Sequence, residues 1–227
     1  MSETTNIPYN LSIRITTDGF SFTLLQNASV ILRRSVQCGS HSLPENLRNE
    51  LLQQNLLGKR FQRVNVLLHT HSQMVPNELY RKEDEDTWLK SLRVATMRQE
   101  IVGSEYIPQC GCYNVFAIPQ NIHDVLREAF GDEVDYSHVS TELIGCLLSN
   151  KEKCLGVYLQ RNSVDIVAVK HGQLLLSNCF SIQNEADAAY WILNVLEQFK
   201  LPARVDTVLV FPEGSSVLSD LLQKLLS

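Results

Sequence analysis

Two short motifs place side chains of metal-binding type close together. His69-Thr70-His71 ends an apolar run, and alternation along a strand would place both imidazoles on one face. Cys110-Gly111-Cys112 is a CxC without a second cysteine pair at zinc-like spacing. Because no further ligand accompanies either motif at a suitable spacing, we interpret the histidines as a polar strand end and the cysteines as thiols. A metal-dependent enzyme that uses His69, His71 or the CxC is kept as a third hypothesis.

Acidic and basic turn residues are the next candidates. The run 83–86 (EDED) has neither the spacing nor the glycine of a calcium loop, so it predicts a solvated helical face. Asp18 precedes Gly19 in a hairpin signal, where we expect it to serve the turn conformation, although it could supply an acid. Arg161 lies in another turn and could bind an anion, but solvation of an ordinary turn is the simpler interpretation.

Aromatic residues offer possible partner anchors, because Trp and Tyr are enriched at binding hot spots. Tyr190, Trp191 and Trp88 are the candidates. We expect Tyr190 to lie in the core; Trp191 is the better surface candidate, although core packing is the simpler interpretation. The sequence contains no nucleophile elbow, zinc-protease helix motif, Walker loop or dinucleotide loop. The motifs therefore name no catalytic residue and no metal ligand.

Composition narrows the class of protein. The chain has 227 residues, 44% of them hydrophobic and 20% charged, with a net charge of −5. It lacks the basic footprint of a nucleic-acid binder and any apolar run of about 18 residues. Residues 1–10 are polar without a signal-peptide pattern, and the six cysteines are scattered. We therefore expect a cytoplasmic protein with reduced thiols, no nucleic-acid partner and no membrane insertion, built as one large domain or two small lobes.

The elements that must position these residues begin with a strand meander. Alternating apolar residues predict strands at 11–17, at 20–24 after a turn with positive φ at both Asp18 and Gly19, and at 30–36. Ser42 and Glu45 have capping-box spacing and predict a helix that Gly58 ends. The run 64–68 predicts a buried strand, and a helix is expected over 76–92.

The middle of the chain is less regular. We expect strands at 99–107, 113–118 and 134–139. Asn121 is expected to cap a helix that Gly131 closes, and Ser140 is expected to cap another.

The last third repeats the first. Strands are expected at 154–160, 163–170 and 173–182, and Asn184 with Asp187 predicts the start of a helix. A buried strand at 205–211 and a final helix capped by Ser215 or Ser216 follow. The apolar stripe of the first of these helices is expected to be Ala186, Ala189, Tyr190, Leu193 and Leu196.

Residues 11–92 and 154–227 thus share the order β-β-β-α-β-α without a residue-level repeat. The pattern predicts an α/β protein of mixed sheets covered by helices, with a duplicated βββαβα two-lobe architecture. We expect residues 1–150 to form the first lobe, with an inserted ββαβα region at about 93–150. Residues 151–227 are expected to form the second lobe after the polar break at 150–153.

This duplicated pattern resembles the actin, Hsp70 and sugar-kinase superfamily. Residues 11–25, 155–180 and 208–225 are similar to its first hairpin, second hairpin and adenosine segment. Along most of its length the chain also resembles an uncharacterised family of bacterial proteins with an actin-like ATPase fold, in the stretches LSIRITTDGFSF, VPNELY and NCFSIQNEADAAYWIL. Pilus-assembly and secretion-system cytoplasmic proteins are more distant look-alikes. The resemblance implies two lobes around a nucleotide cleft and frequent work in holding partners.

The same resemblance exposes departures at every nucleotide contact. Arg14 and Thr16 fall where the superfamily has the Asp and Gly of its first hairpin, and a cation there repels magnesium. Tyr158 takes the second acid position, followed by a turn with side chains in place of glycines. The candidate residues of such a vestigial cleft are Thr16, Thr17, Asp18, Gly19, Arg161, Asn162, Ser163, Glu213 and Gly214.

We therefore hypothesise an actin-like protein that has lost nucleotide hydrolysis and serves as a binding or assembly module for a protein partner. No cofactor is expected under this hypothesis. The alternative is a nucleotide-binding ATPase or kinase with atypical phosphate loops, which would use ATP and magnesium.

Overall fold

The computed structural model describes residues 9–27, 29–91, 99–132, 134–211 and 216–226. The chain divides into two compact units, each formed by three separate segments of the sequence. The first comprises residues up to Gln73, Arg81–Ser104 and Val115–His138; the second comprises Met74–Tyr80, Glu105–Asn114 and Val139–Ser227. In the described part of the chain, no helix is both long enough and apolar enough to cross a membrane. A lobe boundary near residue 150 stays a prediction, and the helix Val139–Ser149 before it belongs to the second unit.

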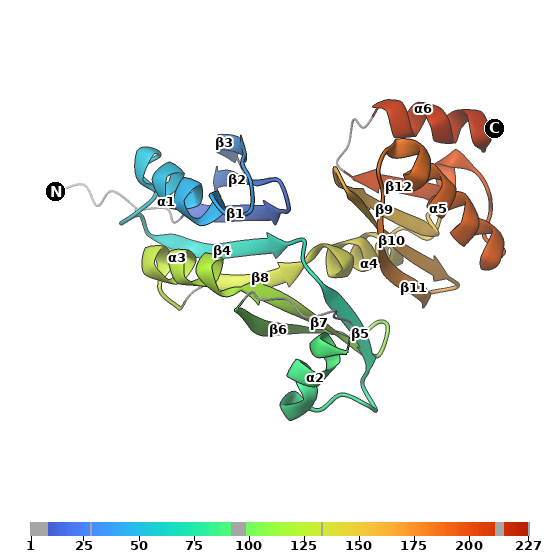
Figure 1. Cartoon of the computed structure of the whole chain (residues 1–227), viewed down its shortest axis with the longest axis horizontal. Coiled ribbons are helices and arrows are strands. Elements are labelled where there is room, and N and C mark those ends of the chain that lie inside the picture. Colours follow the sequence, from blue (N-terminus) through green and yellow to red (C-terminus); the bar gives the residue numbers. More distant parts are fainter. Residues whose placement is uncertain (1–8, 28, 92–98, 133, 212–215, 227) are drawn as a thin grey trace. The chain divides into compact units, whose positions relative to one another are not determined.

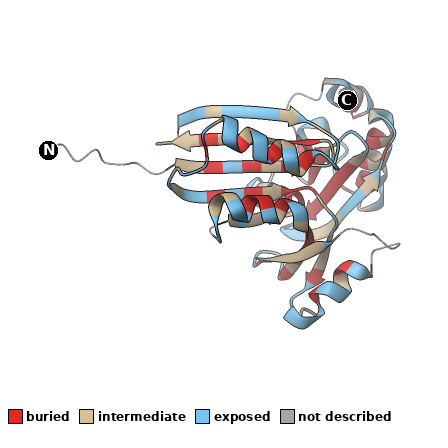
Figure 2. Cartoon of the chain, turned by 60° about the vertical axis from the view of Figure 1, so that its left-hand side comes forward, coloured by how far each residue is buried: buried red, intermediate tan, exposed pale blue. Residues whose placement is uncertain are grey.

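The first unit is built on a five-stranded sheet of order β3-β2-β1-β4-β8. β1 runs antiparallel to β2 and parallel to β4, which is parallel to β8. Apolar residues alternate along the central strands, and α1 and α3 cover the face on which they lie (Figure 2). The elements are β1 (Tyr9–Thr16), β2 (Gly19–Gln26), β3 (Ser29–Gln37), α1 (Leu43–Gln53), β4 (Phe61–Leu68), α3 (Gln120–Phe130) and β8 (Val134–His138).

The second unit repeats this arrangement with a four-stranded sheet of order β11-β10-β9-β12 (Figure 1). Its core joins apolar strand residues to α5 and α6, while Gly156 on β9 faces Leu143 and Leu147 of α4 on the other side. The elements are α4 (Val139–Ser149), β9 (Leu155–Leu159), β10 (Ser163–Lys170), β11 (Gln173–Ser181), α5 (Glu185–Gln198), η2 (Val205–Thr207), β12 (Val208–Phe211) and α6 (Ser216–Leu225).

The duplicated architecture is confirmed. Three antiparallel strands, a helix and a strand parallel to the first occur in the same order in both units, so that β3-β2-β1-β4 corresponds to β11-β10-β9-β12, and β8 is an additional strand of the first sheet. A further three-stranded sheet has the order β5-β7-β6. Its strands are β5 (Ser72–Pro76), β6 (Glu100–Ile107) and β7 (Cys112–Pro119).

The helix expected over 76–92 is wrong for most of its length. Residues 72–76 form β5, the amides of Leu79 and Tyr80 both donate to the Pro76 carbonyl in a turn, and helical structure begins only at η1 (Lys82–Asp84) and α2 (Glu85–Lys90). Leu92 lies outside the described residues. The acidic run is solvated at three positions, but Glu85 is buried and pairs with Lys82 at 2.8 Å. That burial anchors the short helix.

The expected start and the expected end of the first helix are also corrected. The Ser42 hydroxyl donates to the Gly39 carbonyl and makes no bond to the first turn of α1. α1 ends at Gln53 rather than at Gly58, because Asn55 adopts φ +50 and the amide of Leu56 donates to the Leu51 carbonyl. This is a Schellman-type end in which asparagine takes the usual place of glycine.

Two other expected caps, Asn121 and Ser140, are wrong. Asn121 and Ser140 lie inside the first turns of α3 and α4, whereas Gly131 does close α3 with φ +72. Ser215 lies outside the described residues, and α6 begins at Ser216. Asn184 and Asp187 form the expected capping box at α5, with the amides of Ala186 and Asp187 donating to the Asn184 side chain.

The apolar stripe of α5 is rotated from the expected one. Its buried residues are Ala188, Ala189, Ile192, Val195 and Leu196. Tyr190, expected in the core, is 59% exposed, while Trp191 is half-buried and stacks on Phe180 of β11 at a centroid distance of 4.3 Å. Small alanines pack against the sheet and leave the larger aromatic rings at the rim of the core.

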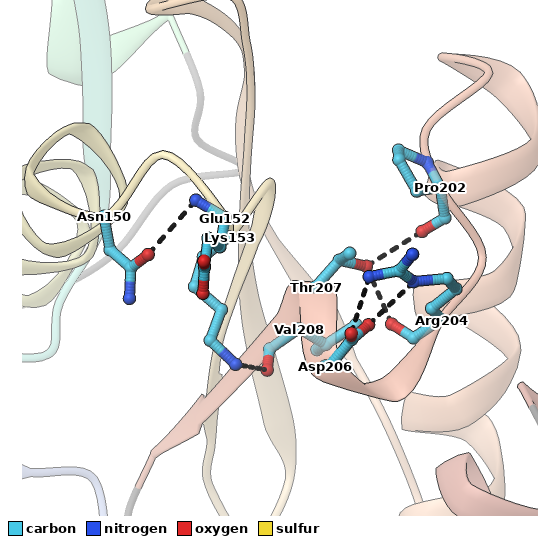
Figure 3. Close-up of polar contacts among 8 residues, drawn as sticks. All are labelled: Asn150, Glu152, Lys153, Pro202, Arg204, Asp206, Thr207 and Val208. Carbon is cyan, nitrogen blue, oxygen red and sulfur yellow. Dashed lines mark hydrogen bonds and ion pairs between the residues drawn. The ribbon is translucent and has the colours of Figure 1, made fainter.

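The strand expected at 205–211 begins three residues late. Residues 205–207 form η2, in which the Thr207 hydroxyl donates to the carbonyls of Pro202 and Arg204 (Figure 3). Arg204 also makes two hydrogen bonds to Asp206, and this interaction lowers the pKa of the Asp206 carboxyl. The turn 205–207 therefore precedes β12, whose pairing with β9 begins at Val208.

The Asn184 box and the unused Ser42 make a matched test. Replacing Asn184 with Ala removes two bonds to the first turn of α5 and should cost about 1 kcal/mol of unfolding free energy. Ser42→Ala removes no cap bond and should cost less than about 0.5 kcal/mol. Urea unfolding followed by circular dichroism measures both, and equal losses would contradict the capping assignments.

Candidate functional site

The first hairpin turn is closed by its own side chains. Thr16 pairs with Gly19 across the turn, and the Thr16 hydroxyl lies 3.0 Å from the Asp18 carboxylate and 3.0 Å from the Gly19 carbonyl. The Asp18 carbonyl accepts from the amide of Cys38 at the end of β3. Asp18 thus serves the conformation of the turn, and its carboxylate is engaged locally.

Gly19 is the one turn position that only glycine fits. It has φ +151, and a Cβ there would collide with the carbonyl oxygen of Val36 on the neighbouring strand. Asp18, in contrast, does not have the positive φ that the sequence pattern predicted. The close approach of β2 to β3, rather than a turn with two left-handed residues, explains the glycine.

Arg14 lies on β1 opposite Ser21 on β2 and Leu67 on β4. Alternation puts it on the same sheet face as Ser12 and Thr16, away from the buried Ile13 and Ile15. Arg14 is therefore a half-buried cation close to the hairpin turn.

A cavity of about 440 Å³ opens beside this turn in the first unit. β1 and β4 are parallel, so their carboxyl ends meet at one sheet edge, where ligands of open α/β sheets commonly bind. The starts of α1 and α3 complete the walls. The described lining residues are Ile15, Thr16, Thr17, Ser40, His41, Leu43, His69, Thr70, Gln99, Pro119, Gln120, Asn121, Ile122 and Asp124.

Short polar contacts fix the floor of this cavity. The His69 amide donates to the Ile15 carbonyl at 3.0 Å, which continues the β1–β4 ladder past the end of β4. The Thr70 hydroxyl donates to the Ala117 carbonyl at 2.6 Å. Nε2 of the fully buried His138 lies 3.0 Å from the Thr70 carbonyl and 3.3 Å from its amide nitrogen. The strand end is held rigidly on two sides.

The lining chemistry suits a small polar ligand better than a magnesium ion. Among the described lining residues Asp124 is the only carboxylate, and it accepts a hydrogen bond from the Gln120 side chain at 2.8 Å. Magnesium prefers an octahedral set of oxygens that includes carboxylates. The same residues contain neither lysine nor arginine, so they present hydroxyl, amide and imidazole groups rather than a strong positive charge.

The remaining candidate residues belong to the second unit or are not described. Arg161 and Asn162 are exposed in the turn between β9 and β10, where the Gln160 amide donates to the Ser163 carbonyl and the Ile182 amide to that of Asn162. Tyr158 is buried in β9 opposite Asp165. Glu213 and Gly214 lie outside the described residues. The structure thus gathers Thr16 and Thr17 into the cavity, with Asp18 and Gly19 completing the turn.

Neither metal-type motif has the arrangement of a metal site by itself. β4 ends at Leu68, His69 is 6% exposed and lines the cavity, and His71 is exposed, so the expected shared face is wrong. All six cysteines are free thiols. Burial raises the pKa of Cys112 to about 11, with the neighbouring Cys110 adding to the shift. A thiol that stays protonated at neutral pH is a poor nucleophile.

Sequence reasoning missed most of the cavity wall. His41 precedes α1, while Asn121 and Asp124 lie on α3, and none of them carries a motif. The signal that could have found them is positional, because residues after parallel strands and at the starts of the following helices converge on one edge. His69 and Thr70 follow the parallel strand β4 and so satisfy this positional rule, but the sequence pattern indicated them as part of a possible metal motif.

Comparisons with known proteins agree with this geometry. The sequence profile of a family described as "Protein of unknown function (DUF3822)" matches residues 1–226. A Bacteroides thetaiotaomicron protein with actin-like ATPase fold and unknown function is similar with a TM-score of 0.81 and 24% identity, covering 100% of this chain and 91% of that one. A chain of the PilM-PilN type IV pilus biogenesis complex gives 0.55 and 12%, with coverages of 96% and 85%. No curated protein sequence matches. The fold is therefore actin-like, as the duplicated pattern implied.

The hairpin can be tested through two glycines. Gly19→Ala forces a Cβ against the Val36 carbonyl at positive φ and should cost about 2 kcal/mol or more of unfolding free energy. At Gly39 a Cβ meets nothing within 4 Å, so Gly39→Ala should change stability by less than about 0.5 kcal/mol. Chemical unfolding distinguishes the two, and a tolerated Gly19→Ala would refute the close approach.

Proposed function

The chain belongs to the DUF3822 family of proteins of unknown function, and we propose that it is an actin-like protein that binds a protein partner without hydrolysing nucleotide. We place it in the bacterial cytoplasm as part of this proposal. The observation that carries it is the closed first hairpin, in which the Asp18 carboxylate accepts from the Thr16 hydroxyl.

Phosphoryl transfer depends on positioning and on neutralising phosphate charge with a metal ion. In the first hairpin the only carboxylate is tied into the turn, and the cation Arg14 lies at the position where the resemblance to the actin superfamily places an acid. In the cavity beside it, Asp124 is the single carboxylate among the described lining residues and is already hydrogen-bonded. One engaged carboxylate supplies too few oxygens for a magnesium site, which supports loss of hydrolysis.

The phosphate-gripping turns support the same proposal. Phosphate is cradled by backbone amides that side chains do not obstruct. The first turn carries Thr16 and Thr17 into the cavity, and the second carries Arg161 and Asn162 at its exposed tip. Neither turn offers the bare backbone that a triphosphate needs.

The partner-binding half of the proposal rests on an exposed aromatic surface. In the second unit Tyr80 and Tyr113 stack at a centroid distance of 3.6 Å, and Tyr106 packs on Tyr113 at 4.8 Å. Tyr106 is 48% exposed, and Leu79, which precedes Tyr80 in the sequence, is 57% exposed. Tyrosines of this kind dominate binding hot spots. PilM, which shares the fold, forms a complex with PilN, and we extend partner binding to this chain by that analogy.

A second candidate function is nucleotide binding by an actin-like ATPase or kinase with atypical loops. The 440 Å³ cavity at the carboxyl ends of β1 and β4 favours it, because such edges are common ligand sites. Under this alternative ATP and magnesium would be the cofactors.

ATP turnover separates the two candidates. We expect no phosphate release above a protein-free blank with ATP and magnesium, because the described residues of the first hairpin and the cavity supply only the carboxylates of Asp18 and Asp124, and both are already hydrogen-bonded. We also expect no change in melting temperature with millimolar ATP or ADP, with or without magnesium. A bound nucleotide at 100 times its dissociation constant would instead stabilise the protein by about 2.7 kcal/mol.

If nucleotide does raise the melting temperature, a variant whose cavity is filled by a larger side chain tests whether the nucleotide binds there. Asn121→Trp, which occupies the cavity, should abolish the shift, whereas Glu45→Trp on the exposed side of α1 should leave it unchanged. Magnesium-dependent turnover that Asn121→Trp removes would overturn the proposed loss of hydrolysis in favour of the second candidate.

Partner binding is tested at the tyrosine surface. Cross-linking in extract of the organism that encodes the chain, followed by mass spectrometry, should identify a partner that wild type and Leu52→Asp both capture. Leu52 is 51% exposed on α1 of the other unit and serves as the control. Tyr106→Asp should lose that partner, because a charge replaces an exposed apolar anchor. Capture unaffected by Tyr106→Asp would contradict this surface.

A further inference from the structure

β11 is an edge strand with unusual freedom to pair. In the described part of the chain its only strand neighbour is β10, and β11 is nine residues long (Figure 1). Its sequence, QLLLSNCFS, contains no charged residue and no proline. Such an edge presents backbone amides and carbonyls that can template another strand. The Cys179 amide donates to the Asn178 side chain at 2.9 Å, so pairing with a second copy exchanges this local bond for one between strands.

A second nine-residue edge among the described strands is protected. β3, the edge of the first unit's sheet, is also nine residues long, but Arg33 and Arg34 interrupt it and a register shift follows Val30. β12, the opposite edge of the second unit's sheet, has only four residues. Charges, bulges and shortness are the devices that keep edge strands from pairing. From Leu176 to Ser181, β11 has none of them.

We propose that β11 pairs with β11 of a second copy of this chain, antiparallel about a twofold axis at Asn178, to join the two four-stranded sheets. This proposal is independent of the proposed partner binding. Closed twofold dimers are the commonest soluble oligomers, and their interfaces are self-complementary.

The register of β11 is self-complementary about Asn178. Leu176 pairs with Ala168 and Phe180 with Val164, both of which lie in the core on the α5 side. With Asn178 on the axis, Leu176 of each copy lies opposite Phe180 of the other on that same face, and Ser177 lies opposite Cys179. Cross-strand aromatic and aliphatic pairs stabilise antiparallel sheets, and here no like charges meet.

Aromatic residues beside the edge extend the contact. Trp191 of α5 stacks on Phe180, and Tyr190, 59% exposed, packs edge-on against Trp191 at 5.3 Å. A pair of short strands alone buries too little surface for a stable dimer, which needs roughly 800 Å² from each subunit. The exposed Tyr190 ring supplies the kind of anchor that such interfaces use.

Light scattering on the full chain tests the proposal directly. At about 100 μM the wild type should elute as a dimer, since a dissociation constant of about 1 μM would then leave little monomer. Asn178→Lys puts like charges opposite each other at the axis and should weaken the dimer about tenfold or more. Ser35→Lys places the same charge on the exposed β3 edge and should leave the dimer intact.

A cross-link checks the register. Asn178→Cys in a Cys179→Ser background should give an interchain disulfide on oxidation, whereas Cys179→Ser alone should not. Circular dichroism confirms that each variant is folded. A wild-type monomer at about 100 μM, a dimer that Asn178→Lys leaves unchanged, or the absence of the cross-link would each overturn the proposal.

Discussion

The parallel pairing of β1 with β4 is the constraint on which the first unit depends. Its register sets Leu11 beside Val64, Ile13 beside Val66 and Ile15 beside Leu68, and all six side chains are buried in one core. Because the strands are parallel, the segments that follow β1 and β4 leave the sheet at the same edge. The hairpin turn, the segment before α1 and the start of α3 are thereby gathered around the cavity. A one-residue slip would bury Ser12 and Asn65 and empty this core.

Most of the fold could be predicted from the periodicity of apolar residues and from the residues that mark turns and helix ends. Alternating residues identified the first strand meander, whose sheet buries one face, and the repeated order of elements identified the duplicated architecture. The failures have physical causes. Residues 76–84 carried too little apolar surface to hold a helix, so the chain formed a strand and a turn instead. Tyr190 fits a helical stripe by spacing, but Ala188 and Ala189 allow a closer approach to the sheet and took the buried face.

The candidate site was predictable only where local sequence determines it. Thr16, Thr17 and Gly19 belong to one turn, and their role follows from the chain around them. His41 and Asn121 reach the cavity through tertiary packing of α1 and α3, which no spacing along the sequence records. His69 was singled out as a possible ligand, yet its position is set by the bond from its amide to Ile15.

An internally satisfied turn differs in kind from one that waits for a ligand. A hairpin that grips phosphate leaves amides and a carboxylate for the nucleotide and its metal, at a cost in stability that binding offsets. Here the Thr16 hydroxyl contacts both the Asp18 carboxylate and the Gly19 carbonyl, and the Asp18 carbonyl accepts from Cys38. The turn is complete without a ligand. The proposed loss of hydrolysis is compatible with an intact actin-like fold, because the core on one face of the first unit's sheet is built without the turn residues at its edge.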